Sequence, residues 1–318
     1  MAHSARTLAE VGESALIERI ARRAGSPAGR DWPLSIGDDA AILRPRAGQD
    51  LVLSVDVVVE DVHFRFERET PRGIGRRALV VNLSDLAAMG AAPVGCLLSL
   101  TAPRSLPLTV FDGLIEGVVE EARRHACPLV GGNLSAASVV SLALTVVGRV
   151  ERGRALRRGR VRAGDRLFVT GLLGVGALAR LRADRTGSSL RHVPTPRLEA
   201  GRALVRRRAT GCVDLSDGLA TDLVHLLEGT GLGAEIEPGA LPRPKGFDRA
   251  CRRLGVDPME LLCAGGEDYE LLFALAGSAR ETPGGLSQRL GLPVHEIGEV
   301  VSRPGLHGLP VAPTPHHF

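Results

Sequence analysis

The stretch Asn82-Leu83-Ser84-Asp85-Leu86-Ala87-Ala88-Met89-Gly90 decides how the first half of this sequence is interpreted. It closes the segment 74–89, which we interpret as a helix. Asn82, Asp85 and Met89 are three to four residues apart and therefore share one helix face. An Asp inside an apolar segment is costly to bury unless it is paired or coordinates a metal. The motif thus predicts a helix whose last turns present polar oxygen atoms.

Other aspartates also interrupt apolar segments, each beside Gly, Ser or Asn. In the predicted strand 51–59, Ser54 and Asp56 project to the same side because side chains alternate along a strand. Mg²⁺ prefers carboxylate oxygens and needs only one or two acids per ion, since water and phosphate complete its shell. Taken singly, each aspartate is better explained as a helix cap or a paired core acid. Taken together they indicate a dispersed Mg²⁺ and nucleotide site, made of Asp38, Asp39, Asp56, Asp85, Asp214 and Asp217.

Two glycine-rich stretches are interpreted as turns that could approach phosphate groups. Gly131-Gly132-Asn133 separates predicted strands at 129–130 and 139–150, and the stretch 170–176 joins a predicted strand to a helix from Val175. Neither is followed by the Gly-Lys-Ser/Thr of a Walker A loop. The glycine spacing of the second does not fit a dinucleotide fingerprint. Ordinary tight turns explain both equally well.

The segment 213–218 places a polar cluster before a predicted helix, 218–228. Asp214 or Ser216 is then either an N-cap residue or part of a phosphate-binding helix start. His63 follows the strand of Asp56, and a lone His is more often structural. Glu267 follows a Gly-Gly pair, which permits close backbone approach, so it could meet a cationic or hydrogen-bonding substrate.

The length of 318 residues favours two domains, and we place the boundary near Glu151, where 151–162 is rich in Arg and Gly. Both halves mix strands and helices without the regular rhythm of a doubly wound sheet, so we expect an α/β (α+β) protein. Further helices are predicted at 7–23, 106–125, 197–208 and 247–254, and further strands at 95–100, 165–170, 269–275 and 294–301.

Composition excludes several classes of function. Aromatic residues make up only 3%, which argues against a stacking platform for nucleic acid, and the formal charge of +4 suits a small anionic substrate. The five Cys show no CxxC pair, so neither a zinc site nor a disulfide framework is expected. The first ten residues lack the apolar run of a signal peptide, and no apolar run reaches 18 residues. We expect a cytoplasmic protein that binds neither nucleic acid nor membrane.

The ordered motifs together resemble those of the thiamine-monophosphate kinases, a family of the aminoimidazole-ribonucleotide-synthetase-like (PurM-like) superfamily. The resemblance covers nearly the whole chain. Its most specific parts are the Asn82–Gly90 stretch and Gly265-Gly266-Glu267-Asp268-Tyr269-Glu270. The other matching motifs are Ile36-Gly37-Asp38-Asp39-Ala40-Ala41, Ser54-Val55-Asp56, Val62-His63-Phe64, Gly131-Gly132-Asn133 and Asp214-Leu215-Ser216-Asp217-Gly218-Leu219.

The resemblance implies a two-domain architecture, and it also assigns a role to individual residues of the site. Residues 1–150 would bind ATP and Mg²⁺ and pair with their copy in a homodimer; residues 151–318 would complete the nucleotide and substrate site. The implied Mg²⁺ ligands are Asp39, Ser54, Val55, Asp56, Asp85, Asn133, Asp214 and Asp217. The implied nucleotide contacts are Gly132, Asn133, Arg158 and Ser216. The implied contacts to the thiamine phosphate are His63, Glu267 and Pro315.

The implied reaction is in-line transfer of the ATP γ-phosphoryl group to thiamine monophosphate, with several Mg²⁺ ions and no catalytic side chain. This suits the residues, because a phosphate acceptor is already ionised and catalysis then rests on positioning and charge neutralisation.

Three positions depart from the family pattern. Asn133 stands where Asp is usual, Val55 where Thr is usual, and the end of the chain around Pro315 lacks the usual Trp or Tyr. A non-catalytic nucleotide- or thiamine-phosphate-binding homologue and another ATP-using enzyme of the superfamily are therefore kept as alternatives. A selenophosphate-synthetase-like enzyme would carry a reactive Cys near the N-terminus, whereas the first Cys is Cys96.

Overall fold

The computed structural model describes residues 6–26 and 31–309, and these residues pack into two compact units. The first unit extends to Leu86 and resumes over Ala92–Arg152. The second consists of Ala87–Ala91 and the described residues from Gly153 onward. The end of the Asn82–Gly90 motif therefore packs with the second unit. There a Cβ on Gly201 would lie 1.9 Å from the carbonyl oxygen of Ala87, so the two backbones are in direct contact.

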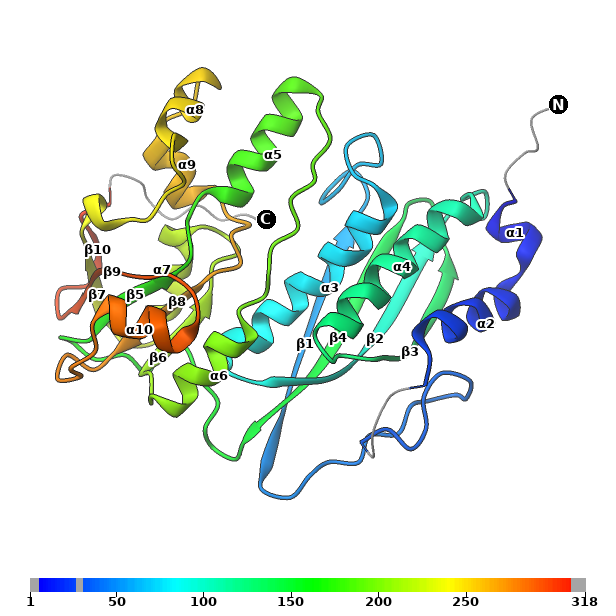
Figure 1. Cartoon of the computed structure of the whole chain (residues 1–318), viewed down its shortest axis with the longest axis horizontal. Helices are drawn as coiled ribbons and strands as arrows, with labels where there is room; N and C mark the ends of the chain where they lie inside the picture. The colour runs from blue at the N-terminus through cyan, green and yellow to red at the C-terminus, as the bar shows by residue number, and fades with distance from the viewer. Residues whose placement is uncertain (1–5, 27–30, 310–318) are drawn as a thin grey trace. The chain divides into compact units, whose positions relative to one another are not determined.

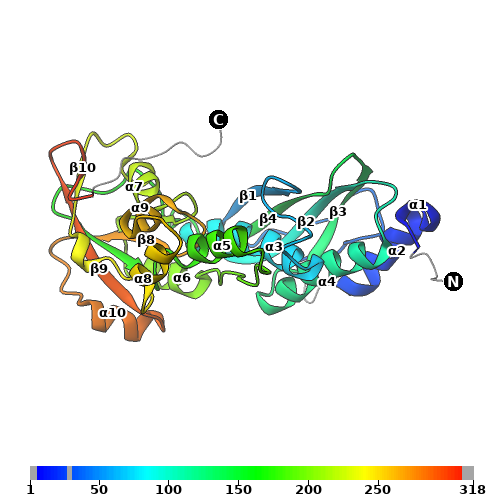
Figure 2. The same ribbon diagram turned by 90° about the horizontal axis from the view of Figure 1, so that it is seen from above.

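The first unit is a four-stranded sheet with helices on one face (Figures 1 and 2). Its strands are β1 (Gln49–Val59), β2 (Ala92–Ala102), β3 (Leu129–Ala136) and β4 (Ser141–Glu151), in the order β1-β4-β2-β3. Only the β2–β3 pair is parallel. The helices are α1 (Leu8–Val11), α2 (Glu13–Ala24), α3 (Pro71–Ala88) and α4 (Leu108–Arg124). Leu98, Leu142 and Leu144 are buried on the helix side of this sheet, where they form its core.

Helices α3 and α4 approach closely because glycines line their contact. A Cβ on Gly75 would lie 2.0 Å from the carbonyl oxygen of Leu114, and one on Gly117 would lie 2.1 Å from that of Arg72. No side chain fits at such distances, so the backbones pack directly against each other. This crossing positions α3, the helix that carries Asn82 and Asp85.

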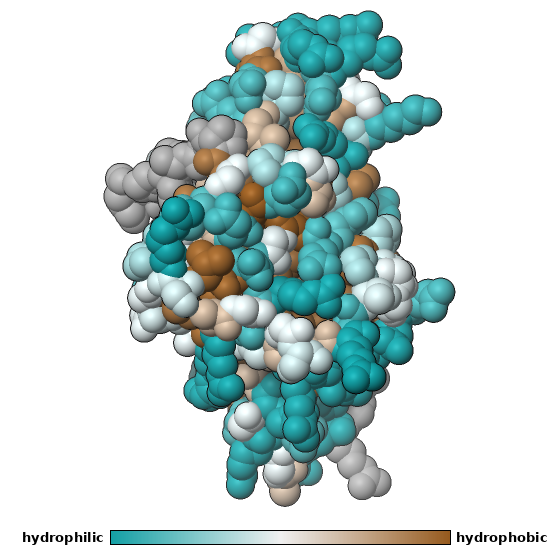
Figure 3. Space-filling model, turned by 90° about the vertical axis from the view of Figure 1, so that its left-hand side faces the viewer, coloured by the Kyte–Doolittle hydropathy of each residue, from teal (hydrophilic) through white to brown (hydrophobic). Residues whose placement is uncertain are grey.

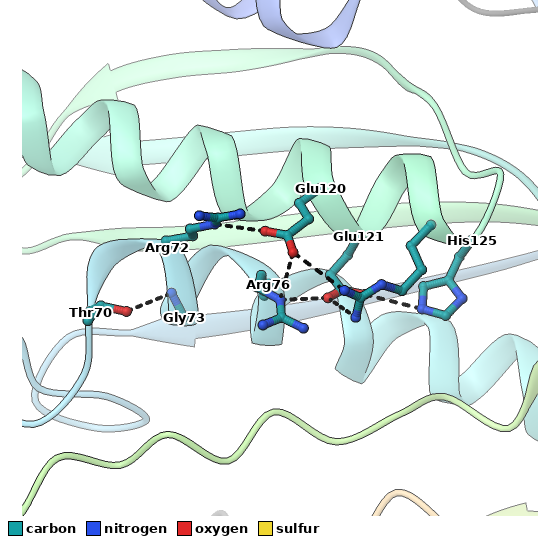
Figure 4. A network of polar contacts seen from close by, with 8 residues as sticks. Thr70, Arg72, Gly73, Arg76, Glu120, Glu121 and His125 are labelled. Carbon is teal, nitrogen blue, oxygen red and sulfur yellow. Dashed lines mark hydrogen bonds and ion pairs between the residues drawn. The ribbon is translucent and has the colours of Figure 1, made fainter.

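A polar network fastens the same two helices along their outer side (Figure 4). Arg76 of α3 donates to Glu121 of α4 at 2.7 Å, and Arg72 donates to Glu120 at 2.8 Å. The Glu121 side chain is only 1% exposed and also contacts Arg124 and His125. Burial raises the pKa of Glu121, but the hydrogen bonds from His125 and Arg76 outweigh it, so the pKa lies below its usual value.

The opposite face of the first sheet carries exposed apolar side chains. On the edge strand β1, Leu51, Leu53, Val55 and Val57 alternate with the inward residues, and Leu53 and Val55 are 64% and 63% exposed. Leu97 of β2 faces the same side and is 36% exposed. Monomeric proteins rarely leave a contiguous apolar face of this kind uncovered.

The second unit is built on a six-stranded sheet of order β10-β7-β9-β5-β8-β6. Its strands are β5 (Arg166–Thr170), β6 (Gly211–Asp214), β7 (Gly233–Ile236), β8 (Leu271–Leu275), β9 (Val294–Val301) and β10 (Gly305–His307). Its helices are α5 (Val175–Thr186), α6 (Leu198–Arg206), α7 (Leu219–Leu227), α8 (Phe247–Arg253), α9 (Pro258–Ala264) and α10 (Pro283–Leu290), with a 3₁₀ turn at Pro238–Ala240. The central strands β5 and β8 are almost wholly buried, and apart from Arg166 and Thr170 their residues are apolar.

The predicted mixed α/β class is confirmed, but some elements differ from prediction. The helix predicted over 7–23 is interrupted at Gly12, whose φ of +79° ends α1. The strand predicted from Tyr269 begins only at Leu271, because Tyr269 has a φ of +50°. Residues 131–132 do not form a turn, since β3 continues through both glycines.

Within the described part of the chain, no helix is long and apolar enough to cross a membrane. Figure 3 shows the face of the molecule that carries the edge of the second sheet around β10. Hydrophilic residues dominate it and apolar side chains gather only in small groups.

Candidate functional site

In the first unit, several side chains that carry oxygen atoms lie close together where β1 meets α3. The Ser54 hydroxyl donates to the carboxylate of Asp85. The backbone N–H of Asp56 donates to Asn82 Oδ1 at 2.9 Å, and Asn82 Nδ2 donates to the carbonyl of Ala78 at 2.9 Å. Asn82 is fully buried, so these two bonds fix its amide and thereby the end of β1. The prediction that Ser54 and Asp56 share a side, and that Asn82 and Asp85 share a helix face, is confirmed.

Val55 and Asn133 lie outside this cluster. Asp56 N–H points away from β4, so the carbonyl of Val55, in the same peptide group, points toward β4. Asn133 is exposed on β3, and the sheet order places β3 three strands from β1, about 14 Å away. Mg²⁺ ligands lie about 2 Å from the ion, so Asn133 and Ser54 of one chain cannot share an ion.

Gly132 is required by strand packing. Its φ is +152°, and a Cβ there would lie 1.8 Å from the carbonyl oxygen of Leu98 on β2. The Gly-Gly pair therefore lets β3 lie against β2 at a register irregularity, where Cys96 pairs with Leu129 and Leu97 with Gly131. The prediction of a turn was wrong because adjacent glycines are more common in turns than at such close approaches.

Asp39 and His63 occupy loops of the first unit. The backbone N–H of Asp39 donates to the Asp38 carboxylate at 2.8 Å, and both residues are exposed. His63 Nδ1 accepts from the backbone N–H of Val59 at 3.2 Å. This fixes the ring with its other nitrogen, Nε2, as the protonated one in the neutral imidazole. His63 thus presents a donor from the loop that follows β1.

The second unit carries a cluster of acids at the end of β6 and the start of α7. Asp214 is 3% exposed and ends β6, while Asp217 lies in the following turn. The carboxylate of Asp222 accepts from the backbone N–H of Asp217 at 3.1 Å and lies 3.4 Å from His225 Nδ1. Gly218 is the N-cap of α7 and no side chain caps it, so the N-cap explanation for Asp214 and Ser216 was wrong.

Asp222 and His225 were missed by the sequence interpretation. The ligand atoms of Asp217, Asp222 and His225 all lie within 4.8 Å of one another. Burial, followed by the charges of Asp214 and Asp217, raises the pKa of Asp222 to about 8, and Arg158 opposes this rise. An Asp between Thr221 and Leu223 in an apolar helix was the available signal.

The loop over Gly265–Glu270 is hydrogen-bonded to this acidic segment. Glu267 N–H donates to the Ser216 carbonyl at 2.8 Å, and Tyr269 N–H donates to that of Leu215 at 2.8 Å. A Cβ on Gly266 would lie 2.5 Å from the Ser216 oxygen, so the two segments lie in direct contact. The structure therefore brings Ser216 and Glu267 together, although 51 residues separate them in sequence (267 − 216).

The glycine-rich stretch 170–176 holds a carboxylate of the protein itself. Asp268 accepts from the backbone N–H of Gly174 at 2.7 Å and from that of Gly176 at 3.2 Å. Burial raises the pKa of Asp268 to about 7, against the opposing effect of these bonds. The start of α5 is a helix N-terminus of the kind that binds anions, and Asp268 occupies it. This turn is therefore not the phosphate-binding turn that the sequence suggested.

Two neighbouring carboxylates of the loop are held by arginines. Glu270 is 4% exposed and accepts from Thr170 Oγ1 at 2.6 Å and from Arg197 Nε at 2.7 Å. Glu267 accepts from Arg180 Nε at 2.8 Å, with a second bond from the other guanidinium nitrogen. Pro315, the remaining residue implied as a substrate contact, lies outside the described residues.

The chain matches two family models along most of its length. Residues 37–150 match AIR synthase related protein, N-terminal domain, and residues 162–308 match AIR synthase related protein, C-terminal domain. The thiamine-monophosphate kinase of Synechococcus elongatus is 36% identical over 95% of this chain and 92% of its own length.

Solved structures agree with this relationship. Thiamine-monophosphate kinase from Stenotrophomonas maltophilia K279a is 36% identical, with a TM-score of 0.81 over 92% of this chain and 95% of that one. AaThiL, solved in complex with AMPPCP and TMP, is 28% identical, with a TM-score of 0.73 over the whole of both chains. This chain therefore belongs to the thiamine-monophosphate kinases, a kinase family within the AIR synthase related proteins, which confirms the resemblance of its motifs.

Proposed function

We propose that this chain phosphorylates thiamine monophosphate with ATP to give thiamine diphosphate, the final step of thiamine diphosphate biosynthesis. The transfer is direct and in line. The observation that carries the proposal is the gathering of oxygen donors in both units, at Ser54, Asp56 and Asp85 and at Asp214 and Asp217. The family relationship and the AMPPCP and TMP complex of a relative support the identity of the two substrates.

The donors fit Mg²⁺, which takes hydroxyl and carboxylate oxygens. Asp39, Ser54, Asp56, Asp85, Asp214 and Asp217 are the proposed protein ligands, and Asn133 is kept as a separate, weaker one. Val55 is left out because its carbonyl points toward β4. Bound Mg²⁺ would neutralise charge on the phosphate groups of both substrates.

The remaining polar residues are proposed to bind and orient. Gly132, Asn133, Arg158 and Ser216 contact the nucleotide, and His63 and Glu267 contact the thiamine phosphate. The acceptor is an ionised phosphate oxygen, so the protein has no proton to remove from it. The task of these side chains is to bring two anionic reactants together in line.

We propose the same division of labour for the two parts of the chain that we expected from the sequence. Residues 1–150 supply the ATP and Mg²⁺ donors around Asp85, and residues 151–318 supply the donors around Asp217 and the substrate contact of Glu267. The division of the structure at Arg152 supports this proposal, because each unit carries its own group of acids.

The decisive experiment incubates the purified protein with ATP, Mg²⁺ and thiamine monophosphate and separates the products by chromatography. We expect thiamine diphosphate and ADP in equal amounts, and no product when unphosphorylated thiamine replaces thiamine monophosphate. ATP binding without any product would favour the non-catalytic homologue instead. Product from a different phosphate acceptor would favour another ATP-using enzyme of the superfamily.

A homodimer is part of the proposal, and the apolar face of the first sheet is its proposed interface. The exposed residues of β1 alternate along the strand, so a second copy of the same face would cover them. Sedimentation of the wild type should give the mass of two chains. Leu53→Glu should give one chain, whereas Leu172→Glu, at an exposed apolar residue of the second unit, should leave the mass unchanged.

A further inference from the structure

The loop Gly265–Glu270 is strained. Gly266, Glu267 and Tyr269 have φ values of +64°, +61° and +50°. Residues with a Cβ rarely adopt this left-handed region, because the Cβ comes too close to the following carbonyl oxygen. Such strain persists only where surrounding contacts determine the backbone, and it concentrates at ligand-binding sites.

Helix α5 is one of the elements that hold this loop. Its N-cap residue Gly174 and its second residue Gly176 both donate their backbone N–H groups to Asp268. A Cβ on Gly176 would lie 2.1 Å from the carbonyl oxygen of Glu267, so the helix backbone lies directly on the loop. Arg180 follows Gly176 by one helical turn and therefore projects on the same side.

Arg180 holds the Glu267 carboxylate by both of its oxygens. Nε donates to Oε2 at 2.8 Å, and the second nitrogen donates to Oε1. This two-bond fork fixes the plane of the carboxylate as well as its position. The two side chains are 31% and 29% exposed, so a ligand can reach the pair.

We propose that Arg180 is a positioning residue for substrate recognition, acting through Glu267. This inference rests on the proposed function and specifies one contact within it. A carboxylate offers about four lone-pair sites, and the fork of Arg180 uses two of them. The remaining two are held in a fixed direction, where they accept hydrogen bonds from an N–H donor. The amino group of the thiamine pyrimidine ring is a donor of this kind.

The pairing also sets the charge that Glu267 presents. The carboxylate and the guanidinium together carry no net charge, so the site selects a hydrogen-bonding group by direction rather than a cation by charge. Lysine at position 180 would keep the charge but lose the fork.

Steady-state kinetics of Arg180→Ala and Arg180→Lys test the proposal, with Arg182→Ala on an exposed position of the same helix as the control. We expect Arg180→Ala to raise the KM for thiamine monophosphate about tenfold, the effect of losing one charge-assisted contact. The kcat and the KM for ATP should change less than about twofold. Arg180→Lys should recover part of the loss, and Arg182→Ala should match the wild type.

A double-variant cycle separates positioning from general stability. In the Glu267→Gln background, Arg180→Ala should change the KM for thiamine monophosphate little further, because both variants interrupt the same contact. Unchanged kinetics in Arg180→Ala would overturn the inference. So would a joint fall in kcat, both affinities and Tm, which would indicate a structural role alone. Absence of turnover in the wild type would instead refute the proposed function, and with it the contact that depends on it.

Discussion

The backbone N–H of Glu267 donates to the carbonyl of Ser216 at 2.8 Å, and this bond joins the proposed substrate loop to the proposed nucleotide segment. A displacement of the Ser216 backbone should therefore also move the backbone of Glu267. The bond also places the strained loop directly beside Asp217, a proposed metal ligand. Binding of nucleotide and binding of thiamine monophosphate should for this reason be sensitive to the same backbone contact.

Gly266→Ala should impair the use of both substrates, ATP and thiamine monophosphate. The new Cβ would lie 2.5 Å from the Ser216 oxygen, and the φ of +64° is unfavourable for alanine. We expect kcat/KM to fall at least about tenfold for ATP and for thiamine monophosphate, with a lower Tm. Gly291→Ala is the matched control, because Gly291 has a φ of +73° but nothing within 4 Å of the new Cβ. Equal losses in both variants would assign the effect to backbone strain and not to contact with Ser216.

Asp85→Asn should abolish turnover while leaving the fold intact. Asn keeps the shape and can still accept from Ser54, but it removes the negative charge that the proposed Mg²⁺ site requires. We expect kcat to fall at least about a hundredfold at saturating Mg²⁺, with Tm within a few degrees of the wild type. The control is Asp184→Asn on an exposed position of α5, which should be fully active. Wild-type turnover in Asp85→Asn would remove this residue from the metal set.

How far the sequence predicts this site depends on whether the contact is local. Ser54 with Asp56, and Asn82 with Asp85, follow from the periods of a strand and a helix, and the structure places both pairs as expected. Arg180 and Glu267 are 87 residues apart, and no periodicity connects them. Asp222 was missed although its contacts are local, because His225 lies three residues further along the same helix and Asp217 lies in the turn before it.

The error at Gly132 shows a second reason why part of this site could not be predicted from the sequence. Adjacent glycines indicate a turn when the sequence is considered alone, since glycine is common there. The need for glycine arises instead from the carbonyl of Leu98 on a neighbouring strand, 34 positions earlier (132 − 98), which only the folded sheet brings close.

Asn133→Asp should strengthen Mg²⁺ binding at position 133, the proposed weak ligand. A carboxylate binds Mg²⁺ more tightly than a neutral amide. We expect the Mg²⁺ concentration for half-maximal activity to fall by about threefold or more, with Tm unchanged because Asn133 is exposed. Ser135→Asp, two residues further along the same exposed strand, provides a control for added charge. A similar fall in both variants would show that the effect is general electrostatic attraction.

Gly117→Ala should destabilise the first unit. Its Cβ would lie 2.1 Å from the carbonyl of Arg72, so α3 and α4 would have to separate. We expect a loss of about 1–3 kcal/mol in the free energy of unfolding, measured by urea denaturation. Gly284→Ala, with nothing within 4 Å on α10, should be neutral or slightly stabilising. Because α3 carries Asp85, the Gly117→Ala variant should lose activity at temperatures well below its Tm.

Glu121→Gln should lower the thermal stability of the protein by an amount that depends on pH, because it removes the charge at the centre of the α3–α4 ion pairs. The pKa of Glu121 is lowered in the folded state, so its ionised form stabilises the protein above the ordinary Glu pKa of about 4.3. That contribution is lost as the pH falls through the lower, folded-state value. We therefore expect Glu121→Gln to lower the Tm at pH 7, and the difference from the wild type to shrink between pH 5 and pH 3. Glu116→Gln, at an exposed residue of the same helix, should show a much smaller difference across this range, because a surface pair contributes about 0–1 kcal/mol. A difference for Glu121→Gln that stays constant with pH would mean that the side chain stabilises the α3–α4 contact by packing and not by its charge.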